Sequence, residues 1–143
     1  MKTPLLSICF PTKNRAKALE SAISSIVSEQ IFLSSHDIEI IISDNCSNDE
    51  TQNIIEKYVT EYPDKVFYHR NELDTFDKNL EIALSYGNGK FLKAQNDHFG
   101  FLPGALDFLL SIIKHCEKSK PNLFLLNSRT CKTLETRMNT GFY

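Results

Sequence analysis

Apolar and polar positions along this chain fall into blocks that predict strands and helices in turn. The apolar runs that predict strands occupy residues 5–10, 38–43, 66–69, 90–95 and 122–127. Between these runs, apolar residues recur at the three- and four-residue spacing of amphipathic helices. Repeated strand-helix alternation with short connections implies right-handed crossovers, so the pattern predicts an α/β fold with a mostly parallel, Rossmann-like sheet flanked by helices.

Start and stop signals place four helices between the predicted strands. The first begins near Arg15 with Asn14 as its N-cap, and the second follows a capping-box pattern at residues 47–50. The third is expected over residues 74–86, and the fourth opens at Pro103. The apolar residues expected to face the core from the third helix are Phe76, Leu80, Ala83 and Leu84.

The second predicted strand ends in an acid followed by a polar turn. It carries three consecutive isoleucines, Ile40 to Ile42, and such a strand is covered on both faces, which indicates a central strand of the sheet. Ligands of parallel sheets bind at the carboxyl ends of the strands, and Asp44 stands at that end. The polar loops at residues 11–15, 44–49 and 96–100 are therefore expected to converge on one candidate site.

Composition narrows the classes of function. A chain of 143 residues, 41% hydrophobic and 24% charged with a formal charge of −2, is typical of a globular domain, and no basic excess favours nucleic acid as a partner. The four cysteines lack metal-binding spacing, which indicates reduced thiols and a cytoplasmic protein. No apolar stretch has the length of a membrane span, so at most peripheral contact with the inner face of a membrane is expected.

Several motifs common on this architecture are missing from the sequence. It has neither the GxGxxG turn of dinucleotide-binding enzymes nor the GxxxxGK[ST] loop of P-loop enzymes. It also lacks the GxSxG elbow of α/β-hydrolases and the HExxH zinc motif. These absences disfavour most familiar enzymes with a doubly wound sheet.

Four segments in order resemble one family. They are LSICFPTKNR at residues 6–15, IISDNCSNDET at 41–51, GKFL at 89–92 and PGAL at 103–106. Together they are similar to family 2 glycosyltransferases, which have the GT-A fold, over about residues 4–127. Together with Arg70-Asn71 and Asp77-Lys78-Asn79 downstream, these segments are most similar to the abequosyltransferase-like branch, which builds bacterial surface polysaccharides.

The resemblance implies a nucleotide-sugar site. Pro11, Thr12, Asn14 and Asp44 would hold the base and ribose, and a carboxylate suits this role because it can accept the ring N–H of a pyrimidine. The side chains that could offset the charge of the diphosphate are Lys13, Arg15, Arg70 and Lys78. Asn71, Asp77 and Asn79 also match family positions. The alternative is structural: these acids and amides cap helices, and the basic side chains are solvated.

The family's metal motif is altered in this chain. The Asp-x-Asp motif, which carries Mg²⁺ or Mn²⁺, falls on Asn96-Asp97-His98, so both acidic positions are replaced. Hard cations prefer carboxylate oxygens, although His98 could still bind Mn²⁺ and Asp97 could turn inward. Asn96 and Asp97 are thus expected to contact the donor, with Asp97 and His98 as metal ligands. The alternative is an ordinary polar loop.

The resemblance also divides the chain. Residues 1–127 are expected to form the donor-binding domain, and the polar residues 128–143 to begin an acceptor region that is missing. An inverting transferase needs a general base, which the family places in that region. Glu135 is the sole carboxylate of this tail and matches no acceptor motif, so the sequence identifies no catalytic residue.

These inferences predict a glycosyltransferase, or its donor-binding domain. It would transfer a sugar from a nucleotide-diphosphate sugar to a glycan or lipid-linked saccharide, a bacterial surface polysaccharide precursor. The alternative is a catalytically inactive nucleotide-binding or interaction domain derived from such an enzyme. A doubly wound signalling domain is a third possibility, but Asp44 alone is a poor substitute for a phosphorylation pocket.

Overall fold

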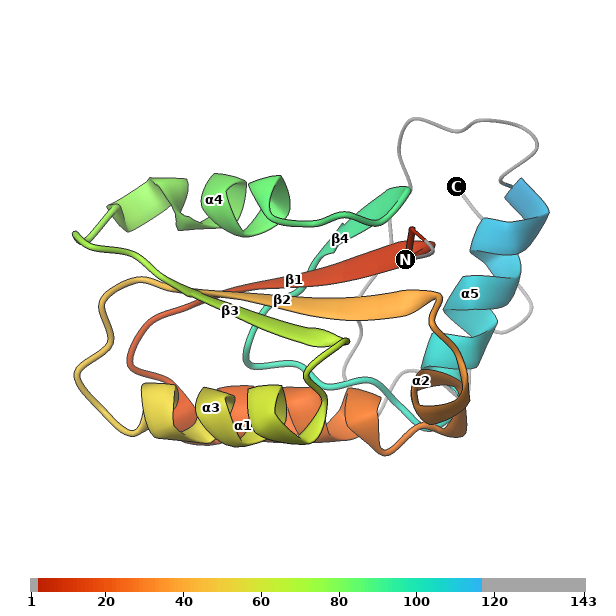
Figure 1. The fold of residues 1–143 in the computed structure, drawn as a ribbon, viewed down its shortest axis with the longest axis horizontal. Helices are drawn as coiled ribbons and strands as arrows, with labels where there is room; N and C mark the ends of the chain where they lie inside the picture. Colours follow the sequence, from red (N-terminus) through yellow and green to blue (C-terminus); the bar gives the residue numbers. More distant parts are fainter. Residues whose placement is uncertain (1–2, 117–143) are drawn as a thin grey trace, which may run out of the picture. The chain divides into compact units, whose positions relative to one another are not determined.

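The structure, a computed structural model, describes residues 3–116 and contains a parallel sheet (Figure 1). Its four strands lie in the order β3-β2-β1-β4, and all neighbours are parallel. The strands are β1 (Leu6–Thr12), β2 (Ile38–Asp44), β3 (Val66–Arg70) and β4 (Phe91–Ala94). The predicted architecture and the first four predicted strands are confirmed, whereas the fifth, at 122–127, lies outside the described residues.

Helices cover both faces of this sheet. Helices α1 (Ala16–Val27) and α3 (Thr51–Glu61) pack side by side on one face, and α4 (Asn79–Ser85) covers β1 and β2 on the other (Figure 1). The remaining helices are α2 (Gln30–Ser34), which the sequence pattern did not predict, the 3-10 turn η1 (Phe76–Lys78) and α5 (Ala105–Cys116). Residues up to Ile112 form one compact unit that contains the whole sheet. Within residues 3–116, no helix is long and apolar enough to cross a membrane.

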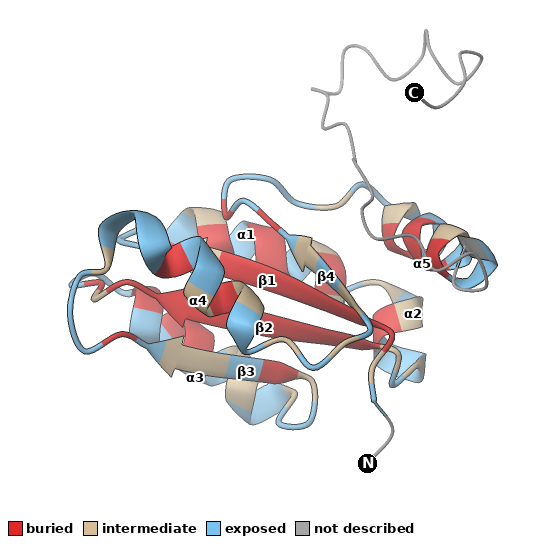
Figure 2. Cartoon of the chain, turned by 90° about the horizontal axis from the view of Figure 1, so that it is seen from above, coloured by how far each residue is buried: buried red, intermediate tan, exposed pale blue. Residues whose placement is uncertain are grey.

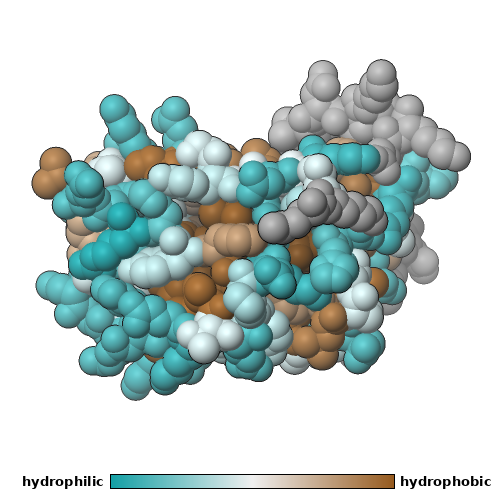
Figure 3. All heavy atoms as spheres, in the orientation of Figure 1, coloured by the Kyte–Doolittle hydropathy of each residue, from teal (hydrophilic) through white to brown (hydrophobic). Residues whose placement is uncertain are grey.

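The core lies on the two central strands. All seven residues of β2 are buried, and β1 is buried except at Pro11 (Figure 2). Their apolar residues stand in register, with Ile8 opposite Ile40 and Phe10 opposite Ile42. Burial of one such side chain contributes about 1.5–3 kcal/mol, so the isoleucine-rich strand fixes the centre of the fold. At the outer edge, β3 presents apolar surface between the more polar helix layers (Figure 3).

The third predicted helix is shorter than its pattern indicates. Regular helix begins only at Asn79, and Phe76 adopts a left-handed φ of 48° in the preceding turn. The carboxylate of Asp74 accepts the Phe76 N–H at 3.0 Å, a local bond that competes with helix formation. The expectation that Phe76 and Leu80 face the core is therefore wrong: they are 87% and 41% exposed.

One carboxylate caps the starts of both α1 and α3. Asp49 accepts the backbone N–H of Ala16 at 3.2 Å and that of Thr51 at 3.0 Å. Burial opposes ionisation, but the hydrogen bonds from Thr51 and Ala16 lower the pKa of Asp49 below its ordinary value. The predicted N-cap at Asn14 and the predicted capping box are both wrong, since neither makes the capping bond that the pattern implies.

A buried acid holds the opposite end of the sheet together. Glu39 accepts a hydrogen bond from the Ser7 hydroxyl and another from the Asn88 N–H, both at 2.6 Å. The Ser7 hydroxyl in turn accepts the Gly89 N–H at 2.7 Å. These bonds join the turn before β4 to the two central strands, and so fix the register of β4 against β1.

Candidate functional site

The loops after β1 and β2 are locked together at the carboxyl edge of the sheet. The Asn14 N–H donates to the Ser47 hydroxyl at 2.8 Å, and the Asn48 N–H donates to the side-chain oxygen of Asn14 at 2.7 Å. Asn14 adopts a left-handed φ of 51°, which asparagine tolerates better than most residues. The loop after β4 joins them through Asp97, which contacts Thr12 and Arg15. The convergence of the three loops is confirmed.

These loops border a cavity of about 490 Å³, a size typical of small-molecule sites. The residues that line it are Pro11, Thr12, Lys13, Arg15, Asn45, Asp74, Phe76, Asp77, Asn79, Leu80, Asn96 and Asp97. Eight of the residues that the resemblance places at the donor are in this lining: Pro11, Thr12, Lys13, Arg15, Asp77, Asn79, Asn96 and Asp97. The other five, Asn14, Asp44, Arg70, Asn71 and Lys78, are not.

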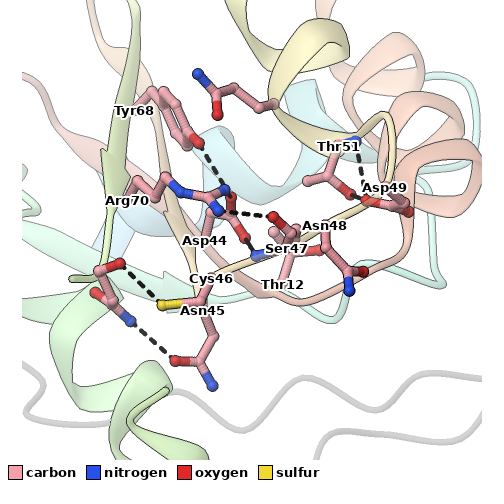
Figure 4. A network of polar contacts seen from close by, with 12 residues as sticks. Thr12, Asp44, Asn45, Cys46, Ser47, Asn48, Asp49, Thr51, Tyr68 and Arg70 are labelled. Atoms are coloured by element: carbon pink, nitrogen blue, oxygen red, sulfur yellow. Dashed lines mark hydrogen bonds and ion pairs between the residues drawn. The ribbon is translucent and has the colours of Figure 1, made fainter. Parts of the chain in front are cut away.

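Asp44 precedes the cavity-lining residue Asn45 and is the centre of a polar network (Figure 4). It is completely buried, and one carboxylate oxygen accepts the Ser47 N–H at 2.9 Å. The other accepts the Tyr68 hydroxyl at 3.0 Å and an Arg70 guanidinium N–H at 2.7 Å. Arg70 also donates to the Ser47 carbonyl at 2.7 Å. The acid thus ties the turn after β2 to the end of β3, where β2 and β3 are paired.

The network predicts an unusual titration of Tyr68. Burial, partly offset by Arg70 and reinforced by the Asp44 charge, raises the pKa of Tyr68 to about 12. Between pH 10 and 12 the unfolded chain loses this proton while the folded chain keeps it, so we expect the free energy of unfolding to fall as pH rises. Absorbance at 295 nm should show a tyrosine titrating near pH 12. That step should vanish in Tyr68→Phe; its survival would contradict the network.

A second amide cluster joins the ends of the strands beneath the cavity. The side chain of Asn79 accepts the Ser43 hydroxyl at 2.7 Å and the Asn71 amide at 3.0 Å. Its own amide donates to the carbonyls of Ser43 and Thr12 at 3.0 and 3.3 Å. Asn71 is therefore held below the surface of the cavity, whereas Lys78 is exposed beside it.

The charged side chains of the cavity wall are those of two ion pairs and the carboxylate of Asp77. Lys13 pairs with Asp74, and Arg15 donates to Asp97 at 3.1 Å. The hydrogen bond from Lys13, together with that from the Phe76 N–H, holds the pKa of Asp74 below its ordinary value. Thr12 donates its hydroxyl to the second Asp97 oxygen at 2.9 Å, so both oxygens of this buried carboxylate have partners.

The residues predicted to hold a metal do not fit that role in this arrangement. Asp97 is directed to Thr12 and Arg15, and the Asn96 side-chain oxygen accepts the His98 N–H at 2.9 Å. His98 is exposed and is not in the cavity lining. Divalent cations require several oxygen ligands at once. Within residues 3–116, no three His, Cys, Asp or Glu side chains are grouped so as to hold a metal ion.

Sequence reasoning missed part of the cavity wall. Asn45, Phe76 and Leu80 line it, although the helical spacing of Phe76 and Leu80 indicated core positions. The signal that could have corrected this was Asp74-Thr75, a pair that favours local side-chain bonds over a helix start. Asn45 accepts the Thr75 N–H at 2.8 Å and so fixes this segment over the cavity.

Comparison with known proteins identifies the family. The model of glycosyl transferase family 2 matches residues 7–136, and this chain therefore belongs to that family. It is 38% identical over 88 residues to the abequosyltransferase RfbV of Salmonella typhimurium, a match that covers 61% of this chain and 26% of the relative. It is 32% identical over 108 residues to the GalNAc(5)-diNAcBac-PP-undecaprenol beta-1,3-glucosyltransferase of Campylobacter jejuni, which covers 75% of this chain and 34% of the relative.

Solved structures confirm the fold. TarS of S. aureus superposes with a TM-score of 0.68 at 21% identity, covering 79% of this chain and 33% of that one. The mannosyltransferase PcManGT of Pyrobaculum calidifontis, solved with GDP-Man and Mn²⁺, superposes with a TM-score of 0.65 at 16% identity, covering 79% and 32%. The predicted GT-A fold is therefore confirmed. The chain spans about a third or less of the length of these relatives.

Proposed function

We propose that this chain is the nucleotide-sugar-binding part of a glycosyltransferase that acts on a bacterial surface polysaccharide precursor. The observation that carries the proposal is the cavity at the carboxyl ends of β1, β2 and β4, bordered by Thr12, Asn45 and Asp97. The curated relatives, which are glycosyltransferases by name, support the reaction class. The acceptor would be a glycan or a lipid-linked saccharide.

Within this proposal, the base and ribose lie along Pro11, Thr12, Asn14 and Asp44. Asp44 has spare acceptor capacity because one of its oxygens accepts a single hydrogen bond. It is completely buried, so a direct contact with a base requires the residues that cover it to move. Asn71 and Lys78 would contact the donor from the segment between β3 and α4, and Asn96 from the loop after β4.

The proposal includes no reaction step that depends on a divalent metal. Divalent metals are common in the family, and the PcManGT structure contains Mn²⁺. The predicted ligands Asp97 and His98 would have to move to share one ion, because Asp97 is directed to Thr12 and Arg15 and His98 is exposed outside the cavity lining.

We also propose a cytoplasmic location, with at most peripheral membrane contact. Cys9 and Cys46 are free thiols in the described part of the chain, as expected in a reducing compartment. Burial and the nearby Glu39 raise the pKa of Cys9 to about 12, so this thiol stays protonated at neutral pH. The measurement that checks the location is fractionation of cells that produce the natural protein.

Nucleoside diphosphates should protect the folded chain from unfolding. A ligand that binds only the folded state adds about 2.7 kcal/mol at 100 times its dissociation constant. We expect one of UDP, CDP, GDP or dTDP to raise the melting temperature. The absence of any shift with all four, with and without Mn²⁺, would contradict the proposal.

A matched pair of variants locates the effect. Leu80 lines the cavity and is 41% exposed, so Leu80→Trp should fill part of the space and reduce the shift. Leu33 is similarly exposed, at 48%, but lies on α2 and is not in the lining, so Leu33→Trp should leave the shift unchanged. Equal effects of the two substitutions would place the ligand elsewhere.

A further inference from the structure

The single carboxylate of the loop after β4 already has a cation partner, which comes from the loop after β1. Between residues 95 and 100 the acid is Asp97, which is 3% exposed. Its two oxygens accept from the Thr12 hydroxyl at 2.9 Å and from the Arg15 guanidinium at 3.1 Å. A divalent ion at this carboxylate would have to compete with the positive charge of an arginine, and Asn96 and His98 offer it no second negative charge.

Arg15 is also placed to meet an anion in the cavity. It belongs to the cavity lining, and its side chain is 46% exposed although one of its nitrogens pairs with Asp97. A guanidinium carries five N–H donors, so the pair leaves donors for a ligand. The planar fork of arginine suits two phosphate oxygens at once.

The other cavity cation is less suited to this role. Lys13 pairs with Asp74, and both side chains are about half exposed, so solvent weakens that charge. Arg15, in contrast, is anchored by a buried acid whose position is fixed by Thr12 on β1. An anchored guanidinium loses less side-chain freedom when it binds a ligand.

We infer that the guanidinium of Arg15, held by Asp97, takes the place of a divalent metal ion in binding the diphosphate of the donor. The inference rests on the proposed function, since it presupposes a nucleotide-diphosphate ligand in this cavity. Asp97 is then a positioning residue that orients Arg15, and metal-free binding of the nucleotide is the consequence.

The test measures affinity by calorimetry on the 143-residue chain, in excess EDTA and in Mn²⁺. The probes are UDP, CDP, GDP and dTDP, with inorganic pyrophosphate as a probe independent of the base. We expect affinities in the two buffers to agree within about twofold, and Arg15→Ala to weaken binding about tenfold or more in EDTA. The matched control is Lys17→Ala, an exposed cation two residues further along outside the lining, which should not change affinity.

Two further variants separate this role from a structural one. Arg15→Lys keeps the positive charge but not the planar fork, so its affinity for the nucleotide in EDTA should lie between those of wild type and Arg15→Ala. In Asn96→Asp/His98→Asp, which adds two carboxylates, binding should become tighter in Mn²⁺ than in EDTA. These variants also serve if Arg15→Ala does not fold.

Each contrary result has a distinct meaning. Wild-type binding that requires Mn²⁺ would overturn the inference but leave the proposed function standing. An affinity that is the same in Arg15→Ala as in wild type would also overturn the inference and leave the proposed function standing. Failure of every nucleotide and of pyrophosphate to bind in either buffer would overturn both.

Discussion

Replacing Gly89 by alanine should lower the free energy of unfolding by about 3 kcal/mol. A Cβ atom at this position would lie 2.6 Å from the backbone nitrogen of Ser7 and 2.9 Å from the carbonyl carbon of Leu6. Strand β1 cannot shift to relieve this contact, since it is paired with β2 on one side and β4 on the other. The substitution would also strain the Gly89 N–H bond to the Ser7 hydroxyl.

Urea unfolding of wild type and variant measures this effect, and Gly104→Ala is the matched control. Gly104 has a left-handed φ of 78° but no atom within 4 Å of an added Cβ. Its substitution by alanine should lower the free energy of unfolding only by the conformational strain, about 1 kcal/mol. If Gly89→Ala cost no more than Gly104→Ala, the close approach of the turn to β1 would be wrong.

Replacing Asp44 by alanine should lower the free energy of unfolding by about 3 kcal/mol, because three hydrogen-bond donors lose one buried acceptor together. The Ser47 N–H, the Tyr68 hydroxyl and a guanidinium N–H of Arg70 all donate to this carboxylate. The turn after β2 would lose its tie to β3. Since this turn borders the cavity through Asn45, nucleotide binding should weaken as well.

Asp44→Asn separates the loss of the negative charge from the loss of the side chain, and Asp64→Ala is the control at an exposed acid. Asp44→Asn keeps one oxygen for the Ser47 N–H but loses the ion pair with Arg70, so it should be intermediate in urea unfolding. Asp64 is exposed, and Asp64→Ala should change stability by less than about 0.5 kcal/mol. An Asp44→Ala protein as stable as wild type would show that the network contributes nothing.

The fold could be predicted from sequence because its central signals are local and strong. The three consecutive isoleucines of β2 need cover on both faces, and the structure buries every residue of that strand. The loops that close β1, β2 and β4 converge because parallel strands present their carboxyl ends on one edge. The edge position of a site follows from this topology alone.

The details of the site could not be predicted because they depend on contacts distant in sequence. Phe76 and Leu80 have helical spacing, yet the bonds of Asn45 and Asp74 to their segment replace a helix start with a turn. The local sequence of the loop after β4 predicts that Asp97 is a metal ligand. Its partner Arg15 is 82 residues away, and no local pattern reveals that pair.

The shared cap at Asp49 links the dynamics of two helices. Because one side chain accepts the first N–H of α1 and of α3, rotation of that carboxylate would free both helix ends in a single event. Local opening in proteins follows such cooperative units rather than single elements. The loops after β1 and β2 should therefore fluctuate together, and a ligand that reduces the motion of one loop would also reduce the motion of the other.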